Sequence, residues 1–417
     1  MNSRNVYSLT ARFCQLPLFI CGFRPFFTLS LLTALIFVPI WLWVLVVNPT
    51  RPPMLGGWAL WHGHELLMGF AGAATVGFLL TAVPEFTSSQ PIRPPLLLLL
   101  TLLWICIRLS YFFSAYWGIW PAVCLSIFFW LIVLTNILPP TLYKEKGRHR
   151  SFALVMMVFV VVELCYLLAL TDAKAAYPWL YLLVHLFMVL IVLAASRISM
   201  NVLNNKLQID DNASTARAAD QTPYLARLPR RQLAISAILL CAGTEFLLGN
   251  NAVTGWVALA CMASIFNLLN DWHIGRALLQ RYSLFLYVGY ILMAAGYGAL
   301  GLSYLGVSLL PAAARHILLI GTLGFFILTV MSIVGRIHSG LYLDYRRWLP
   351  LTLCTLLFVV LLRLAAGIFS LLSHWLVFTQ IAVGLWCLIY LVFVLHFLPI
   401  FLTHRKDGQH GCAGPLK

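Results

Sequence analysis

The stretch Leu60–Phe70, LWHGHELLMGF, places two histidines and a glutamate at the start of a long apolar segment. The segment continues as AGAATVGFLLTAV, so it is long enough to cross a bilayer, which takes about 20 apolar residues in helical conformation. It therefore predicts a transmembrane helix that carries ionisable residues at one end. The fold then depends on how many such segments the chain holds, and the function depends on its polar residues.

The composition of the whole chain is that of a membrane protein. Of its 417 residues, 62% are hydrophobic and 9% are charged, whereas soluble domains carry about 25% charged residues. This deficit extends over the full length, which excludes a soluble domain with a single membrane anchor. A net charge of +15 would by itself suit a nucleic-acid-binding protein. The positions of the basic residues therefore have to decide whether the charge serves membrane orientation or nucleic-acid binding.

Twelve segments have the length and polarity of a membrane span. The sequence therefore predicts an all-α polytopic integral membrane protein with about twelve transmembrane helices. The first segment is interpreted as a span and not as a cleaved signal peptide, because no small-residue cleavage site is evident. The predicted spans are 26–47, 58–84, 94–113, 118–138, 151–171, 177–196, 232–249, 253–270, 282–302, 311–335, 349–371 and 375–402.

The basic residues predict the orientation of these helices. With a cytoplasmic N-terminus, the cytoplasmic segments hold 22 of the 27 Lys and Arg residues, and the opposite loops hold only Arg51 and Lys174. Cytoplasmic loops of membrane proteins carry this kind of excess. We therefore predict that both termini are cytoplasmic and that the basic residues orient the helices and contact anionic lipid headgroups. This distribution argues against a nucleic-acid partner.

A single membrane domain, 1–417, is predicted to consist of two six-helix halves. A polar cytoplasmic linker, 197–231, separates the halves 26–196 and 232–402, and 403–417 is predicted to be a flexible tail. No sequence repeat between the two halves is evident. The cysteines within the apolar segments are expected to be small buried side chains. Nothing in the cysteine spacing predicts a disulfide framework.

Ionisable residues inside the predicted spans form the candidate site. An arginine within a span costs about 2.5–3.5 kcal/mol on insertion scales, so it normally has a partner and a function. With the predicted orientation, eight ionisable residues share the outer half of the membrane. The alternative is that residues at this depth simply meet interfacial water. The eight residues are His62, His64, Glu65, Arg108, Glu245, Arg315, His316 and Arg363.

Helix geometry separates the two histidines of the opening stretch. Residues two apart on an α-helix point about 200° away from each other, so His62 and His64 are not expected to bind one metal ion. His62 shares a face with Glu65, and His64 shares another with Met68. We therefore expect His62 and Glu65 to act as a pair and His64 to be a separate ligand. Glu65 and Glu245 are candidates for proton transfer.

Small residues recur at steps of four along the same helix, at Gly69, Ala73 and Gly77. Such a stripe lets another helix or a flat cofactor approach the backbone closely. Helix packing is the expected role, and cofactor contact is the alternative.

Several motifs together resemble one protein family. The chain resembles the NnrS family, bacterial membrane proteins tied to nitric oxide and reported to carry haem and copper. The resemblance runs over most of the chain and is most specific in its N-terminal third. The motifs are GFRPFF (22–27), WHGHELLMGFAGAATVGFLLTAVPEFT (61–87), LWICIRLSYFF with Trp104 and Arg108, AAARHILLIGTLGFFILTVMS with His316, Gly321 and Gly324, and HSG (338–340).

The chain departs from the family pattern at three places, the first near the middle of the chain and the other two in its second half. The proline expected after Arg197 is lost, since Met200 stands there. Tyr287 stands where the family has a histidine, and Ile333 stands where the family has an arginine. The sequence is therefore identified as a divergent member of the family.

The resemblance implies a multi-pass protein of the bacterial inner membrane that binds haem b, with or without copper, and counters nitric oxide. It makes His62, His64 and His316 the first candidates for metal ligands, followed by His185 and His338. The intramembrane arginines would then bind haem propionates or form internal ion pairs. These arginines are Arg108, Arg315 and Arg363. A reductive reaction of nitric oxide would need a separate electron donor, because the chain has no CxxCH haem motif and no iron–sulfur cysteine run. Whether the protein catalyses a reaction or only binds the gas stays open.

Two other classes of function remain. Twelve helices in two halves around polar residues are also the layout of many transporters for a small molecule, a metal or haem. A structural or signalling protein without catalysis is the third possibility.

Overall fold

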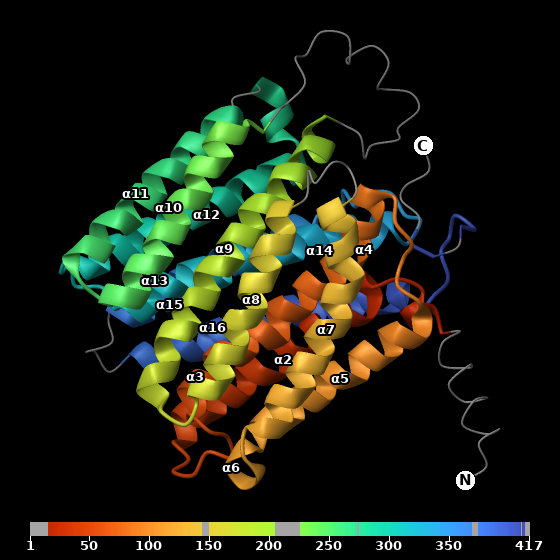
Figure 1. Ribbon diagram of the computed structural model, residues 1–417. Coiled ribbons are helices and arrows are strands. Elements are labelled where there is room, and N and C mark those ends of the chain that lie inside the picture. The colour runs from red at the N-terminus through yellow and green to blue at the C-terminus, as the bar shows by residue number, and fades with distance from the viewer. Residues whose placement is uncertain are drawn as a thin grey trace. The chain divides into compact units, whose positions relative to one another are not determined.

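The computed structural model describes residues 16–143, 150–204, 226–272, 275–368, 374–409 and 411–412 (Figure 1). Within these ranges the protein is helical and has no strand, and twelve helical spans are long and apolar enough to cross a membrane. The prediction of an all-α polytopic membrane protein is therefore confirmed. The spans are Phe23–Val47 (α2), Trp58–Thr87 (α3, η2 and α4), Pro94–Phe112 (α5), Trp120–Tyr143 (α7), Arg150–Ala169 (α8), Ala173–Leu203 (α9), Leu228–Leu248 (α10), Ala252–Trp272 (α11, η4), Arg281–Tyr304 (α12), Pro311–Ile337 (α13, η6 and α14), Trp348–Ile368 (α15) and Trp375–Phe401 (α16).

The largest difference from the predicted boundaries is in the sixth span, which was expected at 177–196 and is found at Ala173–Leu203. The apolar segment ends near Lys174 and Arg197, but the helix continues through both residues. Hydropathy measures the segment that prefers hydrocarbon, and a helix can extend beyond it because long basic side chains reach the interface. Among the described residues, three short elements lie outside the spans: η1 (Pro17–Phe19), α6 (Ser114–Trp117) and η5 (Gly275–Leu279).

The described chain forms two compact units. Unit 1 contains the chain up to Leu183 together with Val334–Leu341 and the residues from Trp386 onward. Unit 2 contains Val184–Ile333 and Tyr342–Leu385. Residues 205–225 of the predicted linker lie outside the described residues. The cytoplasmic position of the termini and the division into six-helix halves stay predictions.

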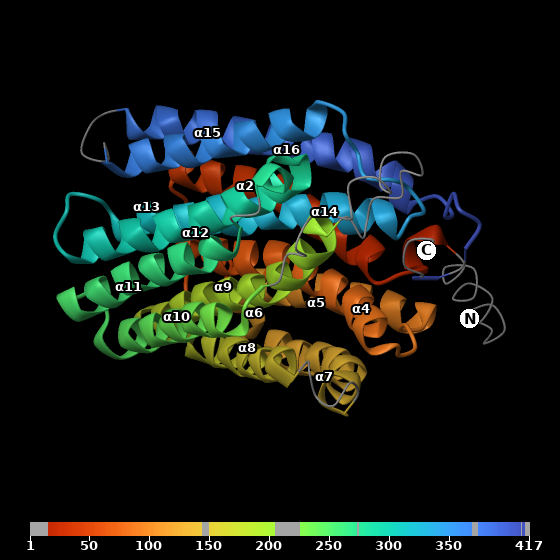
Figure 2. The same ribbon diagram turned by 90° about the horizontal axis from the view of Figure 1, so that it is seen from above.

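In unit 1, α2 packs along α4 and η2, and α7 packs against α4, α5 and α8 (Figure 2). Gly77 of α4 faces α2, where an added Cβ would lie 2.9 Å from Cβ of Phe26 and 3.3 Å from the backbone of Phe23. A side chain at this position would push the two helices apart. The small-residue stripe therefore serves helix packing at Gly77, as expected.

In unit 2, α11 packs against α10 and α12, and the three helices lie side by side in Figure 1. The helix α12 also packs against α13 and η6, which in turn contact α15. Gly296 of α12 permits this approach, because a Cβ there would lie 2.5 Å from the side chain of Leu318 and 3.2 Å from its backbone nitrogen. Glycine thus sets a close packing distance in both units.

Two spans are interrupted by π-helix. In the second span, η2 (Glu65–Gly72) lies between α3 (Trp58–His64) and α4 (Ala73–Thr87). In the tenth span, η6 (Ile317–Gly324) lies between α13 (Pro311–His316) and α14 (Phe325–Ile337). A π-helix bonds residue i to residue i+5, is rare, and occurs frequently at functional sites. Both interruptions begin directly after a candidate ligand histidine.

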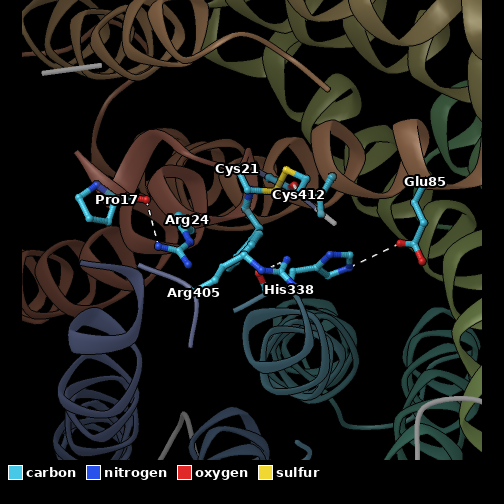
Figure 3. Close-up of a disulfide and its surroundings, with 10 residues drawn as sticks. Pro17, Cys21, Arg24, Glu85, His338, Arg405 and Cys412 are labelled. Atoms are coloured by element: carbon cyan, nitrogen blue, oxygen red, sulfur yellow. Dashed lines mark hydrogen bonds and ion pairs between the residues drawn. A yellow bond between two sulfur atoms is a disulfide. The ribbon is translucent and has the colours of Figure 1, made fainter. Parts of the chain in front are cut away.

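A disulfide joins Cys21 to Cys412 (Figure 3), a cross-link that the cysteine spacing did not predict. Near it, the buried guanidinium of Arg24 donates to the carbonyls of Pro17, Phe401 and Thr403. The tail that was expected to be flexible is therefore tethered at Cys412, while His410 and residues 413–417 lie outside the described residues.

The cysteines inside the spans are only partly buried, which corrects the expectation for this group. Cys241 and Cys261 are buried, Cys165 and Cys387 are intermediate, and the remaining three lie on exposed helix faces. In a membrane protein an apolar side chain has no need to enter the core, because the lipid-facing surface is itself apolar. The three exposed residues are Cys106, Cys124 and Cys354.

Candidate functional site

The opening stretch leads to a buried charged cluster in unit 1. Glu65 is the first residue of η2, and its Oε1 accepts hydrogen bonds from Arg108 Nη1 at 3.0 Å and from His64 Nδ1 at 3.1 Å. The side chain of Arg108 comes from α5. His64 and Glu65 are fully buried, and Arg108 is 7% exposed. The intramembrane arginine therefore has an internal acid as its partner, as the ion-pair alternative predicted.

A second carboxylate faces the same guanidinium. Glu163 of α8 lies with Oε1 4.0 Å from Arg108 Nη2, and its Oε2 accepts a hydrogen bond from the indole of Trp130 on α7. We call His64, Glu65, Arg108 and Glu163 the Glu65 cluster. Two carboxylates around one guanidinium leave a negative charge in a buried place, which is costly unless a proton or a cation balances it. The cluster is therefore suited to bind positive charge.

The ring of His64 is fixed with one nitrogen free. Its face stacks on Tyr166, with ring centroids 4.6 Å apart and planes 4° apart, and Tyr111 meets it edge-on at 5.1 Å. The two hydroxyls lie 3.0 Å apart, and Tyr166 donates to the carbonyl of Leu60. The bond to Glu65 assigns the proton of the neutral ring to Nδ1. The buried Nε2 has no hydrogen-bond partner among the described residues, so its lone pair is available to a metal.

His62 lies in a different environment from His64, as helix geometry predicted. Its ring stacks on Trp41 of α2, with centroids 4.5 Å apart and planes 12° apart. The expected pairing of His62 with Glu65 is wrong, because Glu65 bonds to His64 and Arg108. That expectation used helical spacing alone, which does not show that the adjacent His64 and Arg108 of α5 reach the same carboxylate.

A small cavity lies beside the Glu65 cluster, and its free volume of about 10 Å³ has room for about one water molecule. A porphyrin at His64 would therefore require the stacked tyrosines to move. The cavity is lined by charged, aromatic and small residues, among them Met68, Gly72, Trp104, Arg108, Trp130 and Glu163.

Unit 2 contains a second charged cluster, which we call the Glu245 cluster. The carboxylate of Glu245 on α10 accepts from Arg315 Nη2 at 2.6 Å, from the hydroxyl of Tyr304, and from His185 Nε2 at 2.7 Å. The other ring nitrogen of His185, Nδ1, lies 2.8 Å from the hydroxyl of Tyr297. Both nitrogens of His185 are thus engaged, and a metal could bind there only by displacing a partner.

His316 ends α13 and has its own fixed orientation. Its Nδ1 donates to the carbonyl of Ala312, one turn earlier, at 2.6 Å. The neutral ring therefore presents Nε2 as the acceptor nitrogen, as His64 does. Arg363, the remaining intramembrane arginine, donates to Thr379 Oγ1 at 2.8 Å.

His338 follows the end of α14 and belongs to the terminal region of unit 1. Its Nε2 lies 3.5 Å from Glu85 Oε2, and its carbonyl accepts a hydrogen bond from Arg405 (Figure 3). The structure thus gives His338 a place beside the disulfide and not in the Glu65 cluster. Its proposed role as a metal ligand stays a prediction.

Several residues of the two clusters were not singled out by the sequence. Glu163 is one of them, although its apolar surroundings, MVFVVVELCYLL, were a signal that this acid lies in a span and needs a partner. The tyrosines carried no such signal, because Tyr111, Tyr166 and Tyr304 are ordinary residues of apolar helices until the fold brings them to a histidine or a carboxylate.

Within the described residues, no group of three or more His, Cys, Asp or Glu side chains is arranged to hold a metal ion. His64 and His316 each offer one imidazole nitrogen, which suits a haem iron in donor type, but a porphyrin at His64 has no room unless Tyr111 and Tyr166 move.

Comparison with protein-family models gives a match over most of the chain. The family model described as NnrS protein matches residues 17–405, nearly the whole chain. No curated protein matches it.

Proposed function

Because the chain belongs to the NnrS family, a family of membrane proteins of the nitric oxide response, we propose that it is a haem-binding protein of the bacterial inner membrane that binds or removes nitric oxide. Haem b is the proposed cofactor, with copper as a second metal that imidazole nitrogens also suit. Family membership supports the biological role, and the residues of unit 1 support the chemistry.

The observation that carries this proposal is the free Nε2 of the buried His64, whose Nδ1 is held by a carboxylate. Histidines that ligate metals almost always donate their other ring nitrogen to a carboxylate, a carbonyl or water, which fixes the tautomer and raises the basicity of the ligand. A bound haem iron would supply the site at which nitric oxide coordinates.

The Glu65 cluster adds the capacity to take up a proton. Its surplus carboxylate is compensated by protonation, and Glu65 lies within hydrogen-bond distance of both His64 and Arg108. In this proposal Glu65 positions His64, and Glu163 is the second carboxylate that can hold a proton. A reductive reaction would take its electrons from a separate donor in or at the membrane.

A spectrum of the purified protein tests the proposal. The full-length chain in mild detergent is expected to show a Soret band that shifts when nitric oxide is added. The His64→Ala variant should lose intensity in this band, and the matched variant His62→Ala, two residues earlier on the same helix, should retain it. A colourless protein that contains neither iron nor copper by elemental analysis would disprove the proposal.

A transporter is the second candidate, and a specific observation favours it. Transporters often have interrupted helices at their substrate sites, and the second and tenth spans are both interrupted by π-helix. Uptake of a solute, a metal or haem into proteoliposomes that contain the colourless protein would support transport.

A further inference from the structure

The terminal region of unit 1 contains a cysteine pair that the proposed function does not use. The disulfide between Cys21 and Cys412 lies outside the membrane spans, because Cys21 precedes the first span and Cys412 follows the last. The distribution of basic residues predicts that both ends of the chain face the cytoplasm. Cytosolic thiols are kept reduced, and the disulfides found there are usually transient and either catalytic or redox-sensing. A disulfide in this place is therefore expected to open and close.

The bond fastens the end of the terminal segment, residues 402–412, which other contacts hold at its beginning. Arg405 Nη1 donates to the carbonyl of His338 at 3.0 Å, and the amide of Lys406 donates to the carbonyl of Ser339 at 3.4 Å. Figure 3 shows the disulfide next to Arg405 and His338. Reduction would release the end of the segment and leave its beginning attached, so the bond can open without unfolding of unit 1.

The two sulfur atoms of the disulfide differ in access. Cys21 is 1% exposed, and its Sγ lies 3.6 Å from the hydroxyl oxygen of Thr81. Cys412 is partly exposed in the terminal segment. Thiol–disulfide exchange begins when a thiolate attacks one of the two sulfurs, and access decides which sulfur is attacked. The attacked atom is therefore Cys412 Sγ, and Cys21 is the leaving thiolate.

A buried cation lies close to the leaving group. The amide of Arg24 donates to the carbonyl of Cys21 at 3.2 Å, so the two residues share one turn at the start of α2 (Figure 3). The fully buried guanidinium of Arg24 donates to three carbonyls, and its Nε and Nη2 have no hydrogen-bond partner among the described residues.

This environment favours a thiolate at position 21. A buried charge without a counter-ion is costly, and a cysteine thiolate is stabilised by a neighbouring arginine and by a helix N-terminus. Reduction of the bond would give the charge of Arg24 a counter-ion. A thiolate that is stabilised in this way also leaves faster during exchange.

We propose that Cys21 and Cys412 form a thiol–disulfide exchange site whose substrate is a dithiol reductant of the thioredoxin type. A thiolate of the reductant bonds to Cys412 Sγ, and Cys21 Sγ leaves as a thiolate. The second thiol of the reductant loses its proton and displaces Cys412, which takes up a proton, so the reductant leaves as a disulfide. Oxidised glutathione closes the bond by the reverse exchange and is itself reduced to two thiols. This proposal does not depend on haem binding.

Trapping of the mixed disulfide tests the proposal. The full-length chain in mild detergent is treated with oxidised glutathione and then with a thioredoxin variant that lacks its second cysteine. The reaction is stopped with acid, and peptide mass spectrometry is expected to find thioredoxin linked to Cys412. A link to Cys21 would reject the assignment of the attacked sulfur. A bond that fails to form with oxidised glutathione, or that does not react in the folded protein, would overturn the proposal.

Two other cysteines report whether the protein stays folded during this experiment. Cys241 of α10 and Cys261 of α11 are fully buried inside the spans. They should remain unlabelled by a maleimide while the terminal disulfide is reduced. Their labelling at the same rate as Cys21 would mean that the bond opens only in unfolded protein, which would also overturn the proposal.

Hydrogen exchange tests what the bond fastens. Exchange in the peptide that contains Cys412 should become faster when the wild type is reduced, and exchange in α2 should not change. The matched variant Cys412→Ser should show the fast exchange with and without reductant. Equal exchange in the oxidised and reduced wild type would show that the bond does not hold the segment.

The rate of reduction by dithiothreitol tests the role of Arg24 as a positioning residue. Arg24→Met removes the cation and should slow reduction severalfold, because a less stabilised thiolate leaves more slowly. Arg24→Lys keeps the charge and should react at nearly the rate of the wild type. A variant that was merely loosened would be reduced faster, so an unchanged or faster rate in Arg24→Met would reject this role.

Discussion

The Glu65 cluster and the Glu245 cluster bury charge in different ways. In the Glu245 cluster one carboxylate meets one guanidinium, and both carboxylate oxygens and both nitrogens of His185 have hydrogen-bond partners. In the Glu65 cluster two carboxylates share one guanidinium. Glu65 Oε2 and His64 Nε2 have no partner among the described residues.

This difference indicates different roles. A fully satisfied buried network specifies one structure and rigidifies it, whereas unsatisfied buried polar atoms are rare and call for an explanation such as a bound ion, a ligand or a catalytic role. We therefore assign structural support to the Glu245 cluster and ligand binding to the Glu65 cluster. Variants that separate stability from haem binding can break this assignment or sharpen it.

The largest effect is expected from Arg315→Met. It leaves the carboxylate of Glu245 buried without its cation, and removal of one partner from a buried ion pair typically costs about 3–5 kcal/mol. Thermal unfolding in detergent, followed by circular dichroism, measures the loss. The double variant Arg315→Met/Glu245→Gln removes both charges and should recover most of the stability. If the single variant were as stable as the wild type, the Glu245 cluster could not be the structural one.

The next effect is on haem affinity, and a matched pair of variants compares the clusters directly. Glu65→Gln removes the charge behind His64, and loss of such a supporting partner typically costs about 10–100-fold in metal affinity. Its effect on stability should be small, because Glu163 remains as an acid beside Arg108. Glu245→Gln should show the reverse, with lower stability and unchanged haem affinity at His64. Equal effects of both variants on haem binding would contradict the division of roles.

The sequence predicted the spans well because hydrophobic length is a local property. It also required partners for Arg108 and Arg315, since an unpaired arginine in a span is costly, and left haem propionates and internal ion pairs open. It could not identify those partners. Glu163 and Trp130 reach Arg108 from other spans, and their meeting depends on helix packing that no local pattern encodes.

Two errors have clear physical causes. The pairing of His62 with Glu65 was inferred from spacing along one helix, which cannot show that Arg108 of α5 reaches the same carboxylate. The disulfide between Cys21 and Cys412 joins residues 391 positions apart, a separation at which cysteine spacing carries no information.

A smaller effect is expected where a single neutral hydrogen bond is removed. Tyr297→Phe takes away the hydroxyl beside Nδ1 of the buried His185, and a buried polar atom left without a partner costs about 1–3 kcal/mol. Tyr111→Phe should cost less, because Tyr166 keeps its bond to the carbonyl of Leu60. Unfolding temperatures of the two variants measure the difference. A larger loss from Tyr111→Phe would show that the Glu65 cluster also depends on complete hydrogen bonding.

The smallest effect on stability is expected from an ion pair outside the membrane spans. Its comparison with the Glu65 and Glu245 clusters shows how much a position inside a span contributes. Arg405 donates two hydrogen bonds to the carboxylate of Asp407, from Nε at 3.0 Å and from Nη2 at 2.5 Å. These bonds hold the pKa of Asp407 below its usual range. The stabilisation is therefore present above the pKa of the unfolded chain, about 3.9, and is lost as the pH falls through the lower pKa of the folded protein.

The two residues lie two positions apart in one terminal segment, so their pairing orders little chain, and we expect it to contribute under about 1 kcal/mol although the side chains are only 1% and 9% exposed. The difference in unfolding temperature between the wild type and Asp407→Asn should be small at pH 7 and should vanish under acidic conditions. A difference that persists in acid would assign the effect to packing of the terminal segment and not to charge. Since Arg405–Asp407 and Arg315–Glu245 consist of the same chemical groups and are similarly shielded from solvent, a large gap between their contributions would come from the position of Arg315 and Glu245 inside membrane spans.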